Sequence, residues 1–185
     1  MNAGKEMFQA QTEWIIRNRT SRNIQFVLHL GDIVYNTGRT YQWEIARECL
    51  CALNGRVPYA LCAGNHDGCE RTEPGAPNNT ELYNTYFPWS AYKSLPSTGG
   101  AFETDLAGPM DNTYHYFTGG GVEFMILSIE FCPHEAVIDW VNDVLSDRAH
   151  AEKKVIVITH GWLKGGLPPV ILGSAEPASV RKICP

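Results

Sequence analysis

The chain has 185 residues, a length that suits a single domain, and 44% of them are hydrophobic, which is enough for a packed core. The formal net charge is −5, and no run of Lys or Arg occurs, so the chain lacks the basic footprint of a protein that binds nucleic acid or an anionic membrane. No stretch approaches the ~18 consecutive apolar residues of a membrane span. The first residues are mostly polar and lead directly into a helical pattern, so we expect no signal peptide. The sequence leaves the native compartment and the oligomeric state open.

Helices and strands alternate in the first third of the chain. Apolar residues at helical spacing predict a helix over residues 5–18, and the apolar run 24–30 predicts a buried strand. A second apolar stripe predicts a helix over residues 40–53, which Thr40 can cap. Residues 57–63 predict the next buried strand. Six cysteines are present, but none are spaced C-x-x-C, so a structural zinc site is not expected.

Residues 67–97 differ in composition from the segments around them. Four prolines in this stretch predict a loop, and its many aromatic residues predict that the loop is packed against the domain. A packed loop beside a site often shapes the access of substrate to that site.

The second half of the chain returns to regular elements. Residues 114–117 and 122–129, joined by three glycines, predict a β-hairpin. Residues 136–145 predict an amphipathic helix, and residues 155–159 another buried strand. Residues 164–185 predict an irregular tail, because glycine and proline dominate its start. The whole pattern predicts one layered α/β domain.

Polar residues follow directly after three of the predicted strands. These residues are Asp32, the Asn65–His66–Asp67 run, and His160. Since sites in α/β sheets form outside the carboxyl ends of strands, the three positions could converge. Each alone has an ordinary explanation: a Gly-Asp turn, an Asn in a left-handed turn, or a histidine that hydrogen-bonds locally. Together they supply the oxygen and nitrogen ligands that suit Zn, Fe or Mn.

These residues also carry a resemblance. Gly31-Asp32, Gly64-Asn65-His66-Asp67 and His160 resemble the central motifs of the calcineurin-like metallophosphoesterases. The stretches FVLHLGDIVYN, VPYALCAGNHD, MILSIEFCPHEAVIDWVNDVL and VIVITHG are similar to a bacterial-type branch of that superfamily. The resemblance implies an α-β-β-α sandwich, two divalent metal ions, and the hydrolysis of phosphomonoesters or phosphodiesters.

The resemblance also implies a role for each residue of the set. Asp32 would bridge two metal ions, and Asn65 and His160 would bind the second ion. His66 would contact the phosphate, together with Asn65, and would help to protonate the leaving oxygen. Asp67 would orient the His66 ring, and we expect its carboxylate, or a backbone carbonyl, to hydrogen-bond a ring nitrogen of His66. A carboxylate shared by two dications and a held imidazole both suit the chemistry of phosphoester hydrolysis.

Two motifs of the family are not found in the sequence. The first, D-x-H or D-x-Q, would precede the first helix, and the last, G-H-x-H, would follow His160. We therefore expect residues 1–185 to be a partial domain, incomplete at both termini. By resemblance the first metal ion would keep only Asp32, and the second would keep Asp32, Asn65 and His160.

Three functional interpretations follow from these patterns. The first is an enzyme whose complete domain hydrolyses small-molecule phosphoesters with two metal ions. The second is a catalytically inactive fragment that retains the scaffold and part of one metal site. The third is an α/β binding module without metal, in which the polar strand ends are accidental. Metal content separates the first two from the third, and turnover of an aryl phosphate separates the first from the second. The substrate is left open, since the fold hosts several phosphoesterase activities.

Overall fold

A computed structural model describes residues 3–69 and 76–161. The first half of the described chain contains α1 (Ala3–Asn18), β1 (Val27–His29), α2 (Thr40–Cys51), β2 (Tyr59–Leu61), the 3-10 turn η1 (Asn65–Asp67), α3 (Glu81–Tyr86) and α4 (Trp89–Tyr92). The second half contains β3 (Thr98–Ala101), β4 (Thr113–Gly119), β5 (Val122–Ser128), α5 (Glu135–Ser146), the 3-10 turn η2 (Arg148–His150) and β6 (Lys154–Ile158).

The strands form two sheets. In the first sheet β1 pairs with β2 in parallel, and in the second the order is β3-β4-β5-β6. β3, β4 and β5 pair antiparallel, whereas β5 and β6 are parallel neighbours. The predicted hairpin is therefore confirmed as β4–β5, with the tight turn at Gly120 and Gly121, both of which have positive φ.

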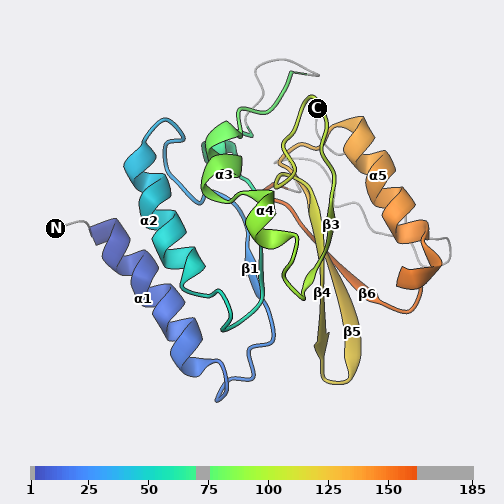
Figure 1. Ribbon diagram of the computed structural model, residues 1–185, viewed down its shortest axis with the longest axis horizontal. Coiled ribbons are helices and arrows are strands. Elements are labelled where there is room, and N and C mark those ends of the chain that lie inside the picture. Colours follow the sequence, from blue (N-terminus) through green and yellow to red (C-terminus); the bar gives the residue numbers. More distant parts are fainter. Residues whose placement is uncertain (1–2, 70–75, 162–185) are drawn as a thin grey trace, which may run out of the picture.

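The two sheets lie between two helical layers, as Figure 1 shows: α1 and α2 cover one side of the β1–β2 sheet, and α5 covers the far side of the second sheet. The alternation of side chains along β5 and the residue after it explains why both faces of the second sheet are covered. Met125, Leu127 and Ile129 pack with α5, while Ile126 packs with Ala60 of β2 between the sheets. The predicted α-β-β-α arrangement is thus the observed mixed α/β fold with two sheets.

Two short helices lie within residues 67–97, the segment that the sequence indicated as a packed loop. The prediction of a loop is wrong for α3 and α4, and β3, which follows that segment, was not predicted. α3 follows Thr80, and its Tyr83 is fully buried in the core cluster that also holds Trp43 of α2 and Phe87. Burial of aromatic residues therefore stabilises helices that are too short to be recognised by periodicity.

The strand predicted over residues 24–30 is shorter and less buried than expected. Only Val27–His29 pair with β2, and Leu28 and Leu30 are 36% and 56% exposed. Within the described residues the second edge of β1 has no paired strand, which explains the exposure of the side chains on that edge. At the start of α2 the N-cap residue is Arg39 rather than Thr40, and no side chain caps this helix end.

The predicted tail, residues 164–185, lies outside the described residues. Within the part that is described, no helix combines the length and apolar character needed to cross a membrane.

His115 of β4 is a buried histidine with an electrostatic consequence for stability. It is 2% exposed, its Nε2 pairs with Thr113 Oγ1 at 2.9 Å, and its Nδ1 has no partner among the described residues. Burial lowers the pKa of His115 to about 4, from about 6.5 in an unfolded chain. The unfolded state therefore binds more protons between these two pH values, so this histidine makes the folded state less stable as the pH falls through that window.

We expect the His115→Gln substitution to flatten the dependence of stability on pH. Relative to the variant, the wild-type chain should lose up to about 3 kcal/mol between pH 6.5 and pH 4. Denaturant unfolding at several pH values measures this difference. Burial raises the pKa of Asp111 to about 6, so this carboxyl group contributes a slope of opposite sign, present in both proteins. Equal slopes in the two proteins would contradict the assignment to His115.

Candidate active site at the strand ends

The structure brings together the ends of β1, β2 and β6. Asp32 follows β1, Gly64 to Asp67 follow β2, and His160 follows β6. The backbone N–H of His66 donates to Asp32 Oδ1 at 3.1 Å, and His160 Nε2 lies 3.3 Å from the same oxygen. Residues that are 128 positions apart in sequence are thus in contact, because β1 and β6 belong to facing sheets.

Two glycines permit this close approach. A Cβ on Gly31 would lie 2.7 Å from His160 Nδ1, and Gly31 has a φ of +89°. A Cβ on Gly64 would overlap the backbone nitrogen and Oδ1 of Asp32 and would lie 3.0 Å from His160 Cγ. Asp32 itself has a φ of +52°, a left-handed conformation that Asp tolerates better than most residues. Backbone strain of this kind often marks a functional site.

The Gly64→Ala substitution is expected to push Asp32 and His160 apart. The added methyl group meets backbone as well as side-chain atoms, so the overlap cannot be relieved by a rotamer change. We expect a loss of about 1–3 kcal/mol in the free energy of unfolding, the usual cost of overpacking. Thermal or denaturant unfolding measures it. Gly38→Ala is a useful comparison, because its φ, like that of Gly64, is not positive, and a Cβ there would meet only the Asn36 side chain, at 3.4 Å. Equal losses in the two variants would mean that overlap with Asp32 and His160 does not set the cost.

His160 is held in one orientation by two contacts. Its Nδ1 lies 2.8 Å from the carbonyl oxygen of Leu30, which can only accept, so Nδ1 carries the hydrogen. The ring of Phe131 packs edge-on against it, with centroids 5.8 Å apart. In a neutral ring this tautomer leaves the Nε2 lone pair facing the Asp32 carboxylate. Two acceptors that face each other at 3.3 Å favour a cation between or beside them.

His66 is exposed and is fixed by backbone and ring contacts. Its Nδ1 lies 2.6 Å from the Tyr35 carbonyl oxygen, so Nδ1 is the donor and Nε2 is left for other partners. Its ring stacks on the Tyr35 ring, with centroids 5.2 Å apart and planes 22° apart. Tyr35 is itself 79% exposed. The His66 imidazole is therefore held beside Asp32 and is open to solvent.

Asp67 does not contact the His66 ring, contrary to the role that the resemblance implied. Its carboxylate is fully buried and accepts hydrogen bonds from the backbone N–H groups of Ile33, Val34 and Gly64, at 2.8 to 3.0 Å. Burial raises the pKa of Asp67, and the three amide donors offset part of that increase. Asp67 thus joins the segment after β1 to the turn after β2, and it can influence His66 only through the backbone that presents the Tyr35 carbonyl.

Asn65 is half-buried and begins the turn that carries His66. Its backbone carbonyl accepts a hydrogen bond from Gly68, but within the described residues its side-chain amide has no hydrogen-bond partner. The amide oxygen is therefore available to an ion or substrate. Among residues 3–69 and 76–161, no group of three or more His, Cys, Asp or Glu side chains is arranged to hold a metal ion.

Sequence reasoning missed the groups that orient the two histidines. The carbonyl oxygens of Leu30 and Tyr35 set both tautomers, and a backbone carbonyl leaves no trace in residue type. Phe131, which packs on His160, had only its place after the β5 strand as a signal.

Comparison with known sequences decides the family. Residues 5–179 match the sequence model of the calcineurin-like phosphoesterases, which is most of the chain. The chain belongs to the calcineurin-like phosphoesterase family. The reaction of this family is phosphoester hydrolysis, and its members generally use divalent metal ions. No solved structure matches the chain significantly.

Three relatives are similar to a large part of the chain. The chain is 28% identical over 160 residues to the uncharacterized protein YvnB of Bacillus subtilis (strain 168), which covers 85% of the chain and 11% of that protein. It is 25% identical over 138 residues to probable inactive purple acid phosphatase 9 of Arabidopsis thaliana, covering 69% of the chain and 21% of that protein. It is 22% identical over 127 residues to a nucleotide pyrophosphatase/phosphodiesterase of Hordeum vulgare, covering 64% of the chain and 28% of that protein. The chain thus spans less than a third of the length of each of these relatives.

Proposed function

We propose that this domain belongs to a metal-dependent phosphoester hydrolase in which Asp32, Asn65 and His160 hold a divalent metal ion. The observation that carries the proposal is the contact between Asp32 and His160, with Nε2 and Oδ1 facing each other at 3.3 Å beside the turn that presents Asn65 and His66. Membership of the calcineurin-like phosphoesterases supports the reaction class.

The residues present fit one ion better than two. Asp32 and His160 retain 37% and 24% exposure of their side chains, so an ion can reach them. A carboxylate, an imidazole nitrogen and an amide oxygen together suit Zn, Mn or Fe. A second ion would share Asp32, but the described residues offer it no group of further His, Cys, Asp or Glu ligands. When bound, a divalent ion would act as a Lewis acid toward the phosphoryl group.

The remaining roles fall to the protein's own side chains. His66, with Nδ1 held by the Tyr35 carbonyl, presents Nε2 toward solvent and can deliver a proton to the leaving oxygen of a phosphoester. Asn65 can bind the ion through its amide oxygen and donate from its amide NH₂ group to a phosphoryl oxygen. Asp67 preserves the geometry of both, because it holds the two segments on which they are presented.

A second candidate function is a scaffold without catalytic activity. Two findings favour it: the incomplete ligand set for a second ion in the described residues, and a relative whose name is probable inactive purple acid phosphatase 9. The two candidate functions imply different ligands. An active domain would take a small phosphomonoester or phosphodiester, and a scaffold would bind at most an ion or a phosphate.

Metal titration tests the proposal. We expect the 185-residue chain to bind one Zn²⁺ or Mn²⁺ ion, and the Asp32→Asn variant to bind it at least about tenfold more weakly, since a charged ligand is lost. Asp139→Asn is the matched control, because it makes the same charge change at an exposed position on α5. Binding that is equal in all three proteins, or absent from the wild type, would contradict the proposal. Two tightly bound ions would show that further side chains complete the site.

A further inference from the structure

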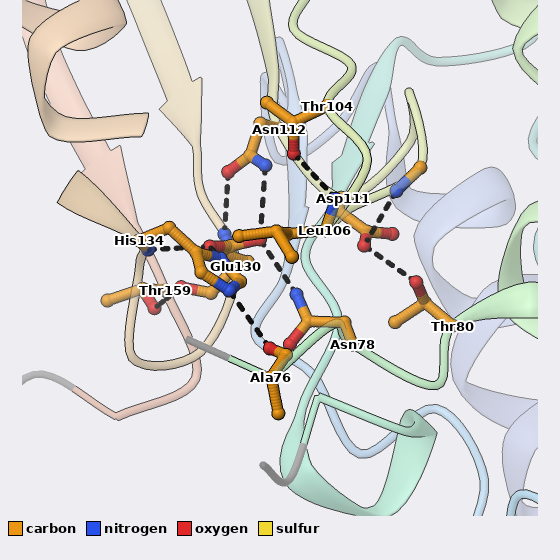
Figure 2. A network of polar contacts seen from close by, with 11 residues as sticks. Ala76, Asn78, Thr80, Thr104, Leu106, Asp111, Asn112, Glu130, His134 and Thr159 are labelled. Atoms are coloured by element: carbon orange, nitrogen blue, oxygen red, sulfur yellow. Dashed lines mark hydrogen bonds and ion pairs between the residues drawn. The ribbon is translucent and has the colours of Figure 1, made fainter. Parts of the chain in front are cut away.

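Glu130 lies outside the proposed metal site, yet all of its polar atoms are engaged. It follows β5 and is fully buried. Its Oε1 accepts from the backbone N–H of His134 at 2.8 Å and lies 2.5 Å from His134 Nδ1. Its Oε2 accepts from the amides of Asn78, at 2.8 Å, and Asn112, at 3.3 Å. Figure 2 shows these side chains converging on the carboxylate.

The network is an expensive way to stabilise a fold. Removing a carboxylate from water costs several kcal/mol, and apolar residues of similar volume often stabilise such a position equally well. His134 uses both ring nitrogens in the network, because its Nε2 lies 3.1 Å from the Ala76 carbonyl oxygen. A fully satisfied polar network instead selects one arrangement of the segments that it joins. The role of Glu130 therefore depends on the segments that its hydrogen bonds join.

One of these segments carries His160. The backbone carbonyl of Glu130 accepts a hydrogen bond from Thr159 Oγ1 at 3.0 Å, directly before His160. The next residue, Phe131, packs on the His160 ring, and a Cβ on Gly161 would lie 2.5 Å from the Phe131 ring. The corner after β5 thus supports the end of β6 from both sides of His160.

The other segment leads to the turn that carries His66. Asn78 and Ala76 are tied to the Glu130–His134 pair, and the next residue, Asn79, donates its backbone N–H to the Gly68 carbonyl at 2.8 Å. Gly68 follows the turn Asn65–Asp67 directly. Glu130 is therefore connected by hydrogen bonds to the segments that carry both halves of the candidate site, which come from different sheets.

We propose that Glu130 is a positioning residue that sets His160 against the end of the β1–β2 sheet: its carboxylate, bonded to His134, Asn78 and Asn112, fixes the corner after β5, and its backbone carbonyl passes that position to Thr159. This inference rests on the proposed function only in so far as His160 is placed there to bind a metal ion. The physical claim is that the contact of His160 Nδ1 with the Leu30 carbonyl, which crosses from one sheet to the other, depends on Glu130.

The Glu130→Gln substitution isolates the charge and acceptor pattern at constant shape. Whichever way its amide turns, the Gln NH₂ group faces at least one donor: the His134 backbone N–H on one side, or the Asn78 and Asn112 amides on the other. Asn112 cannot rotate to compensate, because its Oδ1 already accepts from the Glu130 backbone N–H at 3.1 Å. Thr159→Val is a milder second variant that removes only the link to the residue before His160.

Asp111→Asn is the matched control. Asp111 is also fully buried and accepts from Thr80, Asn84 and Gly108, so its loss should cost comparable stability. None of its hydrogen bonds reaches the corner after β5. A change that follows from lower stability alone should therefore occur in both variants, and a positioning effect only in Glu130→Gln and Thr159→Val.

The readout is the tautomer of His160 in the metal-free chain, labelled with ¹⁵N-histidine and studied by NMR at pH 8. In the wild type and in Asp111→Asn we expect the Nδ1–H tautomer that the Leu30 carbonyl requires. In Glu130→Gln and in Thr159→Val we expect the Nδ1–H share of His160 to fall toward that of a free imidazole. If Glu130→Gln does not fold, Thr159→Val decides alone. An unchanged His160 in the folded variants, or an equal change in Asp111→Asn, would overturn the inference.

A Zn²⁺ titration of the same samples separates this inference from the proposed function. We expect Glu130→Gln to weaken Zn²⁺ binding by about 10- to 100-fold, as changes behind a metal ligand commonly do. If the wild type binds no Zn²⁺, the proposed function fails, while the metal-free spectra still decide the role of Glu130. If the wild type binds Zn²⁺ and Glu130→Gln binds it equally well with an unchanged His160, the role of Glu130 is wrong and the proposed function stands.

Discussion

Replacing His66 with alanine is expected to lower the rate of metal-dependent aryl-phosphate hydrolysis by about 10²- to 10⁴-fold, the usual contribution of a positioned proton donor. The reason is geometric: the Tyr35 carbonyl fixes Nδ1 as a donor, so Nε2 is the ring nitrogen left to deliver a proton. Metal content should stay near that of the wild type, because His66 bonds Asp32 through its backbone N–H, which alanine retains. Turnover and metal analysis of the same preparation measure both quantities, in a length of the protein that has measurable turnover.

The contrast with Asp32→Asn makes the result specific. That variant should lose metal and activity together, whereas His66→Ala should lose activity alone. Loss of bound metal in His66→Ala would identify His66 as a ligand. Unchanged turnover would assign proton delivery to another group.

The Asp67→Asn substitution is expected to lower the free energy of unfolding by about 2–4 kcal/mol. An asparagine can offer one acceptor oxygen where the carboxylate offers two, so at least one of three buried backbone N–H groups would be left unpaired and would face an NH₂ donor. The affected amides belong to the segments that present Tyr35 and Asn65, so the site should loosen as well. Denaturant unfolding measures the first effect, and the Nδ1–H signal of His66 in a ¹⁵N-histidine sample measures the second.

Asp139→Asn on the outer face of α5 provides the comparison, with an expected change within about 0.5 kcal/mol. A loss in Asp67→Asn no larger than that of the control would mean that the three amides find other partners. If the Nδ1–H signal of His66 stays intact although stability falls strongly, Asp67 does not hold the His66 ring in place.

The sequence predicts the fold well where periodicity is strong. The β4–β5 hairpin and α5 match their predicted ranges closely, because alternation along β5 and the buried Val137 and Val141 of α5 leave one arrangement. α3 and α4 were missed, because six- and four-residue helices show no period and depend on tertiary burial of Tyr83 and Tyr92.

The candidate site is predictable in its residue types and not in its contacts. Strand ends and the Gly-Asp and Asn-His-Asp motifs indicate that Asp32, the turn after β2 and His160 converge, and the structure brings their backbones and two of their side chains together. Which backbone carbonyls hold the histidines could not be predicted, since a carbonyl leaves no trace in residue type. Of the two expected partners of the His66 ring, the structure shows a backbone carbonyl, that of Tyr35, because three nearby amides occupy the Asp67 carboxylate.

The proposed metal site is tested most directly in a crystal of the chain grown or soaked with Zn²⁺, with anomalous scattering recorded at the zinc edge. We expect a single strong peak about 2.0–2.2 Å from an Asp32 carboxylate oxygen and from His160 Nε2, with the Asn65 amide oxygen as a further ligand. His66 should lie beside the peak without coordinating it. A peak at another group of side chains, or none between Asp32 and His160 at millimolar Zn²⁺, would contradict the metal site on which the proposed function depends.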